Sequence, residues 1–157
     1  MKRKLFQIIL IASVLLAFAS CDRNRIFEAY QPVSSEGWNK DSIATFLVNV
    51  NDTLQNHNIL INVRNEIEYK YSNLWLFVEI SEPQGLIMKD TFEITLASPT
   101  GKWLGDGFGG LRTRQVMYRR NVYFPVTGEY KMSIQHGMRE SILDGISDIG
   151  IRVEKTN

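Results

Sequence analysis

Short stretches of alternating apolar and polar residues run along most of the chain and predict β-strands. Successive side chains of a strand point to opposite faces, so Phe46, Val48 and Val50 would share one buried face. The same alternation recurs at 59–63, 74–80, 92–96, 130–136 and 149–153, and residues 116–124 form an aromatic-rich stretch. The stretch 74–80 is apolar on both faces, because Trp75 and Phe77 occupy its second face. That pattern predicts a central strand.

Turn-forming residues separate these stretches, for example at 51–52, 83–85, 99–101 and 127–128. About seven or eight short strands at this spacing, with almost no helical periodicity, predict an all-β fold. We expect an antiparallel β-sandwich of jelly-roll or immunoglobulin-like type. Gly128-Glu129-Tyr130 adds a detail, since a Gly-x-Tyr at the start of a strand is typical of a tyrosine corner. In that motif the tyrosine hydroxyl bonds back to the backbone.

The first 20 residues have a different pattern, which is typical of a secretory signal. Three basic residues at 2–4 precede an apolar stretch at 5–19 that is short for a spanning helix, which needs about 20 residues. Small residues then precede Cys21, the only cysteine of the chain. This position is similar to the lipobox cysteine of bacterial lipoproteins, which is acylated on sulfur (palmitate among the chains) and on its new amino group. We therefore expect cleavage before Cys21 and lipidation of Cys21; an ordinary signal peptide with an incidental cysteine is the alternative.

The expected organisation is a signal peptide at 1–20, a lipidated N-terminal tether at 21–37 and one β-sandwich domain at 38–157. The tether is predicted because its residues are mostly polar and include Pro32 and Gly37. The whole chain has 18 basic and 17 acidic residues, and removal of Lys2, Arg3 and Lys4 with the signal leaves 15 basic residues against 17 acidic ones. This balance argues against nucleic acid as a partner.

The chemistry-bearing residues give no strong signal for catalysis. Gly105 to Gly110 fits the pattern G-x-G-x-x-G, but a dinucleotide site needs a helix after it, and residues 116–124 are predicted to be a strand. A glycine-rich loop between strands is the favoured interpretation. The two histidines lack metal-ligand spacing; we expect His57 to be solvated in a turn and His136 to be partly buried with its hydrogen bonds satisfied. No catalytic residue, metal or cofactor is predicted.

Aromatic residues offer one candidate ligand site. Trp38, Trp75, Trp103 and Phe108 are candidates for a sugar-stacking platform. The alternative is that Trp75 lies in the core and the other three cover the ends of the sandwich.

Basic residues offer a second candidate contact, at one end of a predicted strand. Arg112, Arg114, Arg119 and Arg120 lie close together in the sequence. A solvated strand edge that discourages aggregation is the simpler interpretation. The sharper one is a docking patch for an acidic partner or for anionic headgroups.

Blocks spread over the mature chain carry a family resemblance. They include GWNKDS at 37–42, YSNLWLFV at 71–78, GKWLG at 101–105, a Phe-Pro-x-x-Gly-Glu-Tyr at 124–130, SIQHGMR at 133–139 and GISDIGIRVEK at 145–155. Together they resemble the gliding motility lipoprotein GldH family of the Bacteroidota. The resemblance implies a non-enzymatic, lipid-anchored and periplasm-facing envelope protein, in a membrane that it does not specify. Its expected partners are the membrane, through the lipid, and other proteins of the gliding machinery and of type IX-linked envelope assembly.

Two other functions and one modification remain open. The first alternative is a carbohydrate- or peptidoglycan-binding sandwich lipoprotein, and the second is a hydrolase whose site the sequence does not reveal. Exported proteins of the same phylum are glycosylated at Asp-Ser/Thr followed by an aliphatic residue. Asp41-Ser42-Ile43 and Asp52-Thr53-Leu54 fit that pattern, so Ser42 and Thr53 are candidate O-glycosylation sites.

Overall fold

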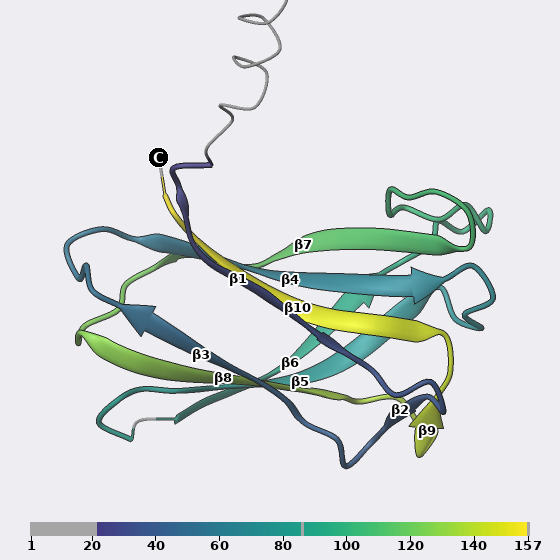
Figure 1. Ribbon diagram of the computed structural model, residues 1–157, viewed down its shortest axis with the longest axis horizontal. Helices are drawn as coiled ribbons and strands as arrows, with labels where there is room; N and C mark the ends of the chain where they lie inside the picture. The colour runs from purple at the N-terminus through teal and green to yellow at the C-terminus, as the bar shows by residue number, and fades with distance from the viewer. Residues whose placement is uncertain (1–21, 86, 157) are drawn as a thin grey trace, which may run out of the picture.

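The computed structural model describes residues 22–85 and 87–156, and within these ranges it contains ten β-strands and no helix. Two four-stranded sheets pack face to face (Figure 1). The first has the order β1-β10-β4-β7. Its strands are β1 (Arg25–Pro32), β10 (Ile146–Lys155), β4 (His57–Glu66) and β7 (Leu111–Val122).

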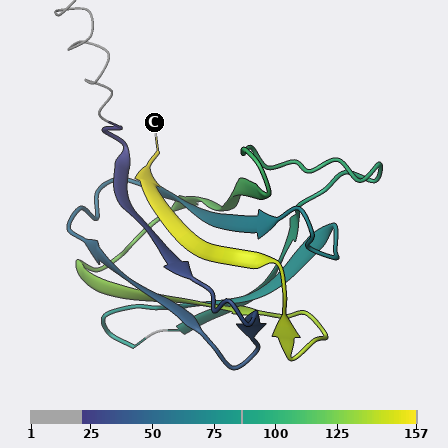
Figure 2. The ribbon, with the colours of Figure 1, turned by 45° about the vertical axis from the view of Figure 1, so that its right-hand side comes forward.

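The second sheet has the order β3-β8-β5-β6, and all pairings in both sheets are antiparallel. Its strands are β3 (Ala44–Val50), β8 (Gly128–His136), β5 (Asn73–Ser81) and β6 (Ile87–Thr95). A short pair, β2 (Trp38–Asn39) with β9 (Ile142–Leu143), lies at one end of the sandwich (Figure 2). The predicted antiparallel sandwich is confirmed. Counting only the eight long strands, the orders are 1-8-3-6 and 2-7-4-5, which is the jelly-roll arrangement.

The core lies between the sheets and is built from the alternating apolar positions of both. Alternate residues of β3, β5 and β8 point inward, as the sequence pattern predicts, whereas bulges interrupt the alternation in β1, β4 and β10. The fully buried side chains include Val48, Ile61, Leu76, Ile94, Met132, Ile134 and Ile151. Removing such side chains from water stabilises the fold by about 1.5–3 kcal/mol each.

The tyrosine corner predicted at the start of β8 is present. The Tyr130 hydroxyl donates a hydrogen bond to the backbone carbonyl of Val126 at 2.9 Å. The Tyr130 ring is 1% exposed and packs edge-on against Phe124, with 4.7 Å between ring centroids. The corner therefore fixes the loop that crosses from the first sheet to the second.

We expect the replacement Tyr130→Phe to lower the free energy of unfolding by about 1–3 kcal/mol, because the Val126 carbonyl loses its donor in a partly buried site. Urea denaturation followed by tryptophan fluorescence measures this difference. Tyr123→Phe is the matched control, since Tyr123 is 59% exposed in the same loop. Equal stabilities for the two variants would contradict a structural role for the corner.

The predicted tether at 21–37 is wrong for residues 25–32, which form β1. This strand pairs with β10 over its whole length, from Arg25 opposite Glu154 to Pro32 opposite Asp148. The sequence pattern is weak here because β1 is an edge strand, whose inward residues are only half-buried. The predicted signal peptide at 1–20 and Cys21 lie outside the described residues.

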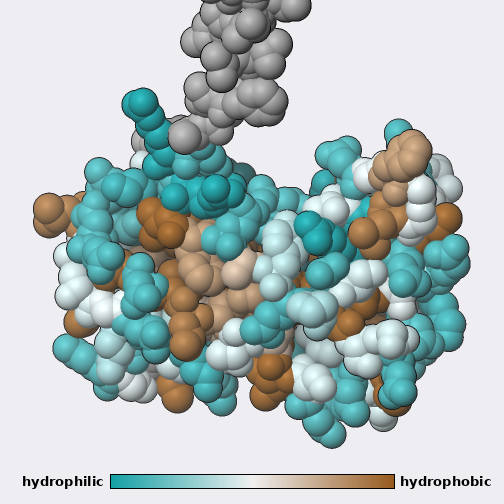
Figure 3. Space-filling model, viewed as in Figure 1, coloured by the Kyte–Doolittle hydropathy of each residue, from teal (hydrophilic) through white to brown (hydrophobic). Residues whose placement is uncertain are grey.

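β1 also closes one open side of the sandwich through a side chain. The backbone N–H of Thr45 on β3 donates to the Gln31 amide oxygen at 3.2 Å, and the Gln31 amide nitrogen donates back to the Thr45 carbonyl. The glutamine amide therefore pairs with the edge of β3 as a neighbouring strand would. Phe27 and Ala29 of β1 pack against the core, and Figure 3 shows apolar side chains gathered on this side of the molecule.

β5 has the central position that the sequence predicts, between β8 and β6. The expected reason for that position is wrong, because only one face of β5 is covered. Trp75 is 39% exposed and Phe77 is 44% exposed on the outer face.

Candidate functional site

Four large apolar side chains are exposed on or beside the β3-β8-β5-β6 sheet, and we call Ile43, Trp75, Phe77 and Ile142 the apolar surface. They are 56%, 39%, 44% and 51% exposed, respectively. Ile142 and Ile43 line one hollow at the β2–β9 end, and Ile43 and Phe77 line a second one on the sheet face. The sequence places these residues on three separate elements, which the fold brings together.

Gly137 lies beside both aromatic residues of this surface. Its N–H donates to the Trp75 carbonyl at 2.7 Å, so it lies directly beside β5. A Cβ at this position would be 3.2 Å from the Phe77 ring, closer than ordinary packing allows. A larger residue here would push the Phe77 ring outward by a few tenths of an ångström.

Polar residues border the apolar surface on the same sheet face. Glu79 and Lys89 form an ion pair at 3.0 Å between β5 and β6, and Gln135 and Ser133 line the same hollow as Phe77. The Gln135 amide donates to the carbonyl of Lys40. An apolar centre with a hydrogen-bonding rim is the usual composition of a protein interface.

The predicted sugar-stacking platform is not assembled, because its members lie in different places. Trp38 is 3% exposed; its indole donates to the Ser42 carbonyl at 2.8 Å, and its ring packs edge-on against His136. Trp103 is half-buried against the core, and Phe108 is 98% exposed in the glycine-rich loop. The alternative, with Trp75 in the core, is also wrong. We expected Trp75 in the core and Trp38 at the surface, and the structure has the reverse arrangement.

The predicted basic cluster is divided between separate contacts. Arg112 donates to the carbonyls of Gly109 and Leu111, both at 2.8 Å, and Arg114 donates to the Leu104 carbonyl at 3.3 Å. These two arginines therefore fasten the loop that precedes β7.

The other two arginines lie at the opposite end of β7. Arg119 forms an ion pair with Asp90 at 2.6 Å, and Arg120 is exposed. The four arginines therefore do not form a single docking patch.

Residues 105–110 form the glycine-rich loop that was favoured over a dinucleotide site. β7, a strand, follows the loop. An added Cβ at Gly107 would lie 2.2 Å from the Leu111 carbonyl oxygen, and Gly109 has φ = 65°. These glycines permit a tight turn against the backbone of β7.

Both histidines are buried in the structure. His57 is 1% exposed at the start of β4, so the expectation that it is solvated is wrong; the register places it opposite both Lys155 and Val122. His136 is 0% exposed, more deeply buried than expected, and its ring packs edge-on against Trp38. Burial lowers the pKa of both imidazoles. Among residues 22–85 and 87–156, no group of three or more His, Cys, Asp or Glu side chains is placed to hold a metal ion.

The two candidate glycosylation sites lie in loops. Ser42 is exposed immediately before β3, next to Ile43 of the apolar surface. Thr53 is half-buried between β3 and β4, where the Asp52 carboxylate accepts the Leu54 N–H at 2.9 Å. Modification of Ser42 and Thr53 stays a prediction.

Comparison with known proteins places the chain in a family. The GldH lipoprotein family matches residues 25–153, which is nearly the whole described domain. The chain belongs to the GldH lipoprotein family. It is 37% identical over 162 residues to a gliding motility lipoprotein GldH homolog of Christiangramia forsetii, with 99% of each chain covered. It is also 37% identical over 155 residues to the gliding motility lipoprotein GldH of Flavobacterium johnsoniae, with 94% of each chain covered.

The GldH family assignment confirms a gliding-motility lipoprotein of the cell envelope, anchored to a membrane. Among solved structures, a GH115 4-O-methyl-α-glucuronidase aligns with a TM-score of 0.44 and 11% identity, covering 88% of this chain and 18% of that one. A likeness this weak carries no functional argument. Over the part of the chain that the structure describes, no helix has the length and hydropathy to cross a bilayer.

Sequence reasoning missed the apolar surface, although a signal for it exists. On the strands flanking β5, the outward positions are polar: Ser133 and Gln135 on β8, and Thr91 and Glu93 on β6. Such neighbours indicate that this sheet face meets solvent. The outward aromatic residues of β5 therefore had to be exposed.

Proposed function

We propose that this GldH-family protein is a non-enzymatic docking subunit of the gliding machinery and of the envelope assembly linked to type IX secretion. Acyl chains on Cys21 hold it to the membrane, and the sandwich faces the periplasm. Docking proceeds through the apolar surface, which receives a protein partner. The family membership supports the association with gliding, and the geometry of the apolar surface supports docking.

The observation that carries this proposal is the exposure of Trp75 and Phe77 beside Ile43 and Ile142. Continuous exposed apolar surfaces on a single domain are typical of interaction sites. Tryptophan is among the side chains that dominate binding energy at protein interfaces, particularly when a polar rim excludes water around it. The Glu79–Lys89 pair and Gln135 supply such a rim.

We expect the double replacement Trp75→Ala/Phe77→Ala to reduce photo-crosslinking to the native protein partner at least tenfold, because the centre of the interface is lost. The measurement is site-specific photo-crosslinking from position 43 in the native host, with identification of the captured protein. Phe108→Ala is the matched control, since Phe108 is exposed but lies outside the apolar surface. Thermal unfolding verifies that both variants are folded.

Saccharide binding is the second candidate, because two exposed rings beside hydrogen-bonding side chains also suit sugar stacking. The same variants separate the two functions when titrated with peptidoglycan fragments. Unchanged protein crosslinks together with lost saccharide binding in the double variant would overturn protein docking in favour of the second candidate.

A further inference from the structure

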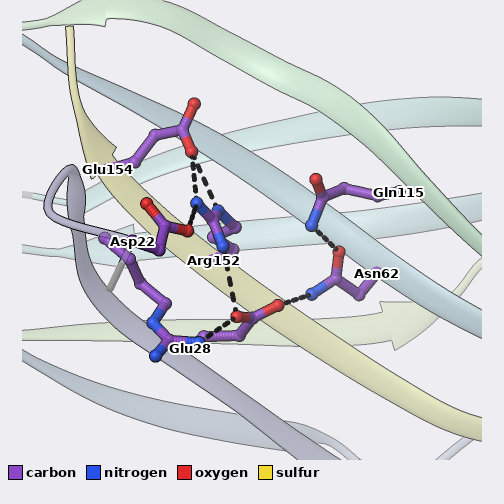
Figure 4. Close-up of polar contacts among 7 residues, drawn as sticks. Asp22, Glu28, Asn62, Gln115, Arg152 and Glu154 are labelled. Carbon is purple, nitrogen blue, oxygen red and sulfur yellow. Dashed lines mark hydrogen bonds and ion pairs between the residues drawn. The ribbon is translucent and has the colours of Figure 1, made fainter. Parts of the chain in front are cut away.

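Arg152 of β10 binds the residue that directly follows Cys21. Its guanidinium pairs with the carboxylates of Asp22, Glu154 (2.8 Å) and Glu28 (3.3 Å) on the outer face of the first sheet (Figure 4). The Arg152 side chain is only 14% exposed, so these charge-assisted hydrogen bonds are partly shielded from water. The hydrogen bond from Arg152 also holds the pKa of the Asp22 carboxyl below its ordinary value.

The contacts of Arg152 extend across every strand of that sheet. Glu28 on β1 accepts a hydrogen bond from the Asn62 amide of β4 at 3.2 Å, and Asn62 in turn accepts one from Gln115 of β7 at 2.8 Å. Asn62 is 0% exposed although it lies on the outer face (Figure 4). The start of the mature chain is therefore fastened to a network that includes β1, β10, β4 and β7.

The backbone provides a second, independent attachment. The Lys155 N–H donates to the Asn24 carbonyl at 2.8 Å, which extends the β1–β10 pairing toward the N-terminus. Consecutive Cα atoms are separated by about 3.8 Å. A lipid carried by Cys21 thus begins one residue from a fixed point of the sandwich.

An apolar side chain projects beside this fixed point. Lys155 forms an ion pair with Asp52 at 3.6 Å, and Asp52 accepts the N–H of Leu54 at 2.9 Å. The Leu54 side chain is 94% exposed at the tip of this loop. A leucine so placed next to acyl chains can enter the boundary between headgroups and hydrocarbon, as the apolar residues of interfacial segments do.

We infer that the sandwich rests directly on the bilayer in one fixed orientation, with the Arg152 network holding the lipidated N-terminus and Leu54 entering the membrane interface. This inference rests on the lipidation of Cys21 in the proposed function. The occupant of the surface around Asp22 and Leu54 is the lipid bilayer. The apolar surface lies on the other sheet, so it is directed away from the membrane and toward soluble or spanning partners in the periplasm.

The test uses lipidated protein, purified from the native host and reconstituted in vesicles of phosphatidylethanolamine and phosphatidylglycerol. With Cys21 acylated, an introduced cysteine is the single free thiol, so Leu54→Cys and Ile142→Cys each take one environment-sensitive fluorophore. Ile142 is the matched control, because it is exposed on the opposite sheet side at β9. We expect spin-labelled lipids to quench the label at position 54 at least threefold more strongly than the label at 142.

Two further variants examine the attachment itself. Insertion of a six-residue Gly-Ser segment between Cys21 and Asp22 leaves the Arg152 network intact but supplies a tether, and it should bring quenching at positions 54 and 142 close to equal. Asp22→Ala should lower the quenching at 54, whereas Arg23→Ala, in an exposed neighbour, should not.

The outcomes separate the orientation from the anchor. If the labelled proteins with the native N-terminus bind vesicles but show equal quenching at 54 and 142, the fixed orientation is overturned while the anchor stays in place. Protein that fails to bind vesicles, with no acyl mass on Cys21, would overturn the anchor and the orientation together.

Discussion

Acidification from pH 8 to pH 5 is expected to lower the free energy of unfolding, because two buried histidines bind protons readily only after the domain unfolds. His57 is 1% exposed and His136 is 0% exposed. Burial lowers the pKa of both below the ordinary value of 6.5, and Lys155 beside His57 and Lys40 near His136 act in the same direction. Asp52 opposes the shift of His57, and the Trp38 backbone together with Glu140 opposes that of His136, but burial outweighs them in both cases.

The sign of this effect follows from proton linkage. Since the folded pKa lies below the unfolded one, the unfolded chain binds more protons between the two values. The stabilisation is therefore complete above pH 6.5 and decreases as the pH falls toward the folded pKa. Each histidine can remove up to about 1.4 kcal/mol per pH unit within that window.

Urea denaturation at pH 8, 7, 6 and 5 measures the loss. The replacements His57→Phe and His136→Phe keep an aromatic ring in each site but remove the titratable group. The free energy of unfolding of the double variant should therefore depend less on pH than that of wild type. Each single variant should remove part of the slope. A wild-type stability that stays constant from pH 8 to pH 5 would show that the histidines do not respond as their burial requires.

Trp38→Ala is expected to lower the free energy of unfolding by about 3–5 kcal/mol, the usual cost of removing a buried tryptophan. Trp38 is 3% exposed, packs against His136 at 5.3 Å between ring centroids, and donates its indole N–H to the Ser42 carbonyl. Its loss leaves a cavity at the β2–β9 end and an unpaired carbonyl. Since domains of this size are stable by about 5–15 kcal/mol, the variant should unfold at a markedly lower urea concentration.

Trp75→Ala is the informative comparison, because the same residue type lies half-exposed on the outer face. We expect a stability change below about 1 kcal/mol for this variant, as for most surface substitutions. Both proteins are compared in the same urea titration. If Trp75→Ala proved as destabilising as Trp38→Ala, Trp75 would be part of the folding core and the apolar surface would lose its central residue.

The pair Trp38 and Trp75 also shows what sequence could and could not predict. Alternation is a local property, so it correctly places Leu74, Leu76 and Val78 on the inner face of β5. Whether the second face is covered depends on packing between distant segments. The sequence near Trp75 does not show whether the outer face of β5 is covered. The polar outward residues of β8 and β6 indicate indirectly that it is not.

β1 was missed for a related reason. Glu28 has a local partner in Arg25, a pair that is equally compatible with a solvated tether. The contacts that place Glu28 in a sheet, with Arg152 and Asn62, come from far along the chain. The tyrosine corner, by contrast, was found because Val126 and Tyr130 are four residues apart. Local motifs could thus be predicted from sequence, whereas edge strands and surfaces assembled from separate elements could not.

The pairing of β1 with β10 has a consequence for how the chain reaches its folded state. β1 is an edge strand whose single strand partner is β10, and Arg25 lies opposite Glu154 (Figure 1). Closing this pair orders nearly the entire domain as one loop, and folds dominated by such distant contacts form slowly. During export β1 emerges first and β10 emerges last, so β1 can pair only when the whole domain has crossed the membrane. Until then one side of the core stays open, and this is the interval in which a newly secreted chain would benefit from a chaperone.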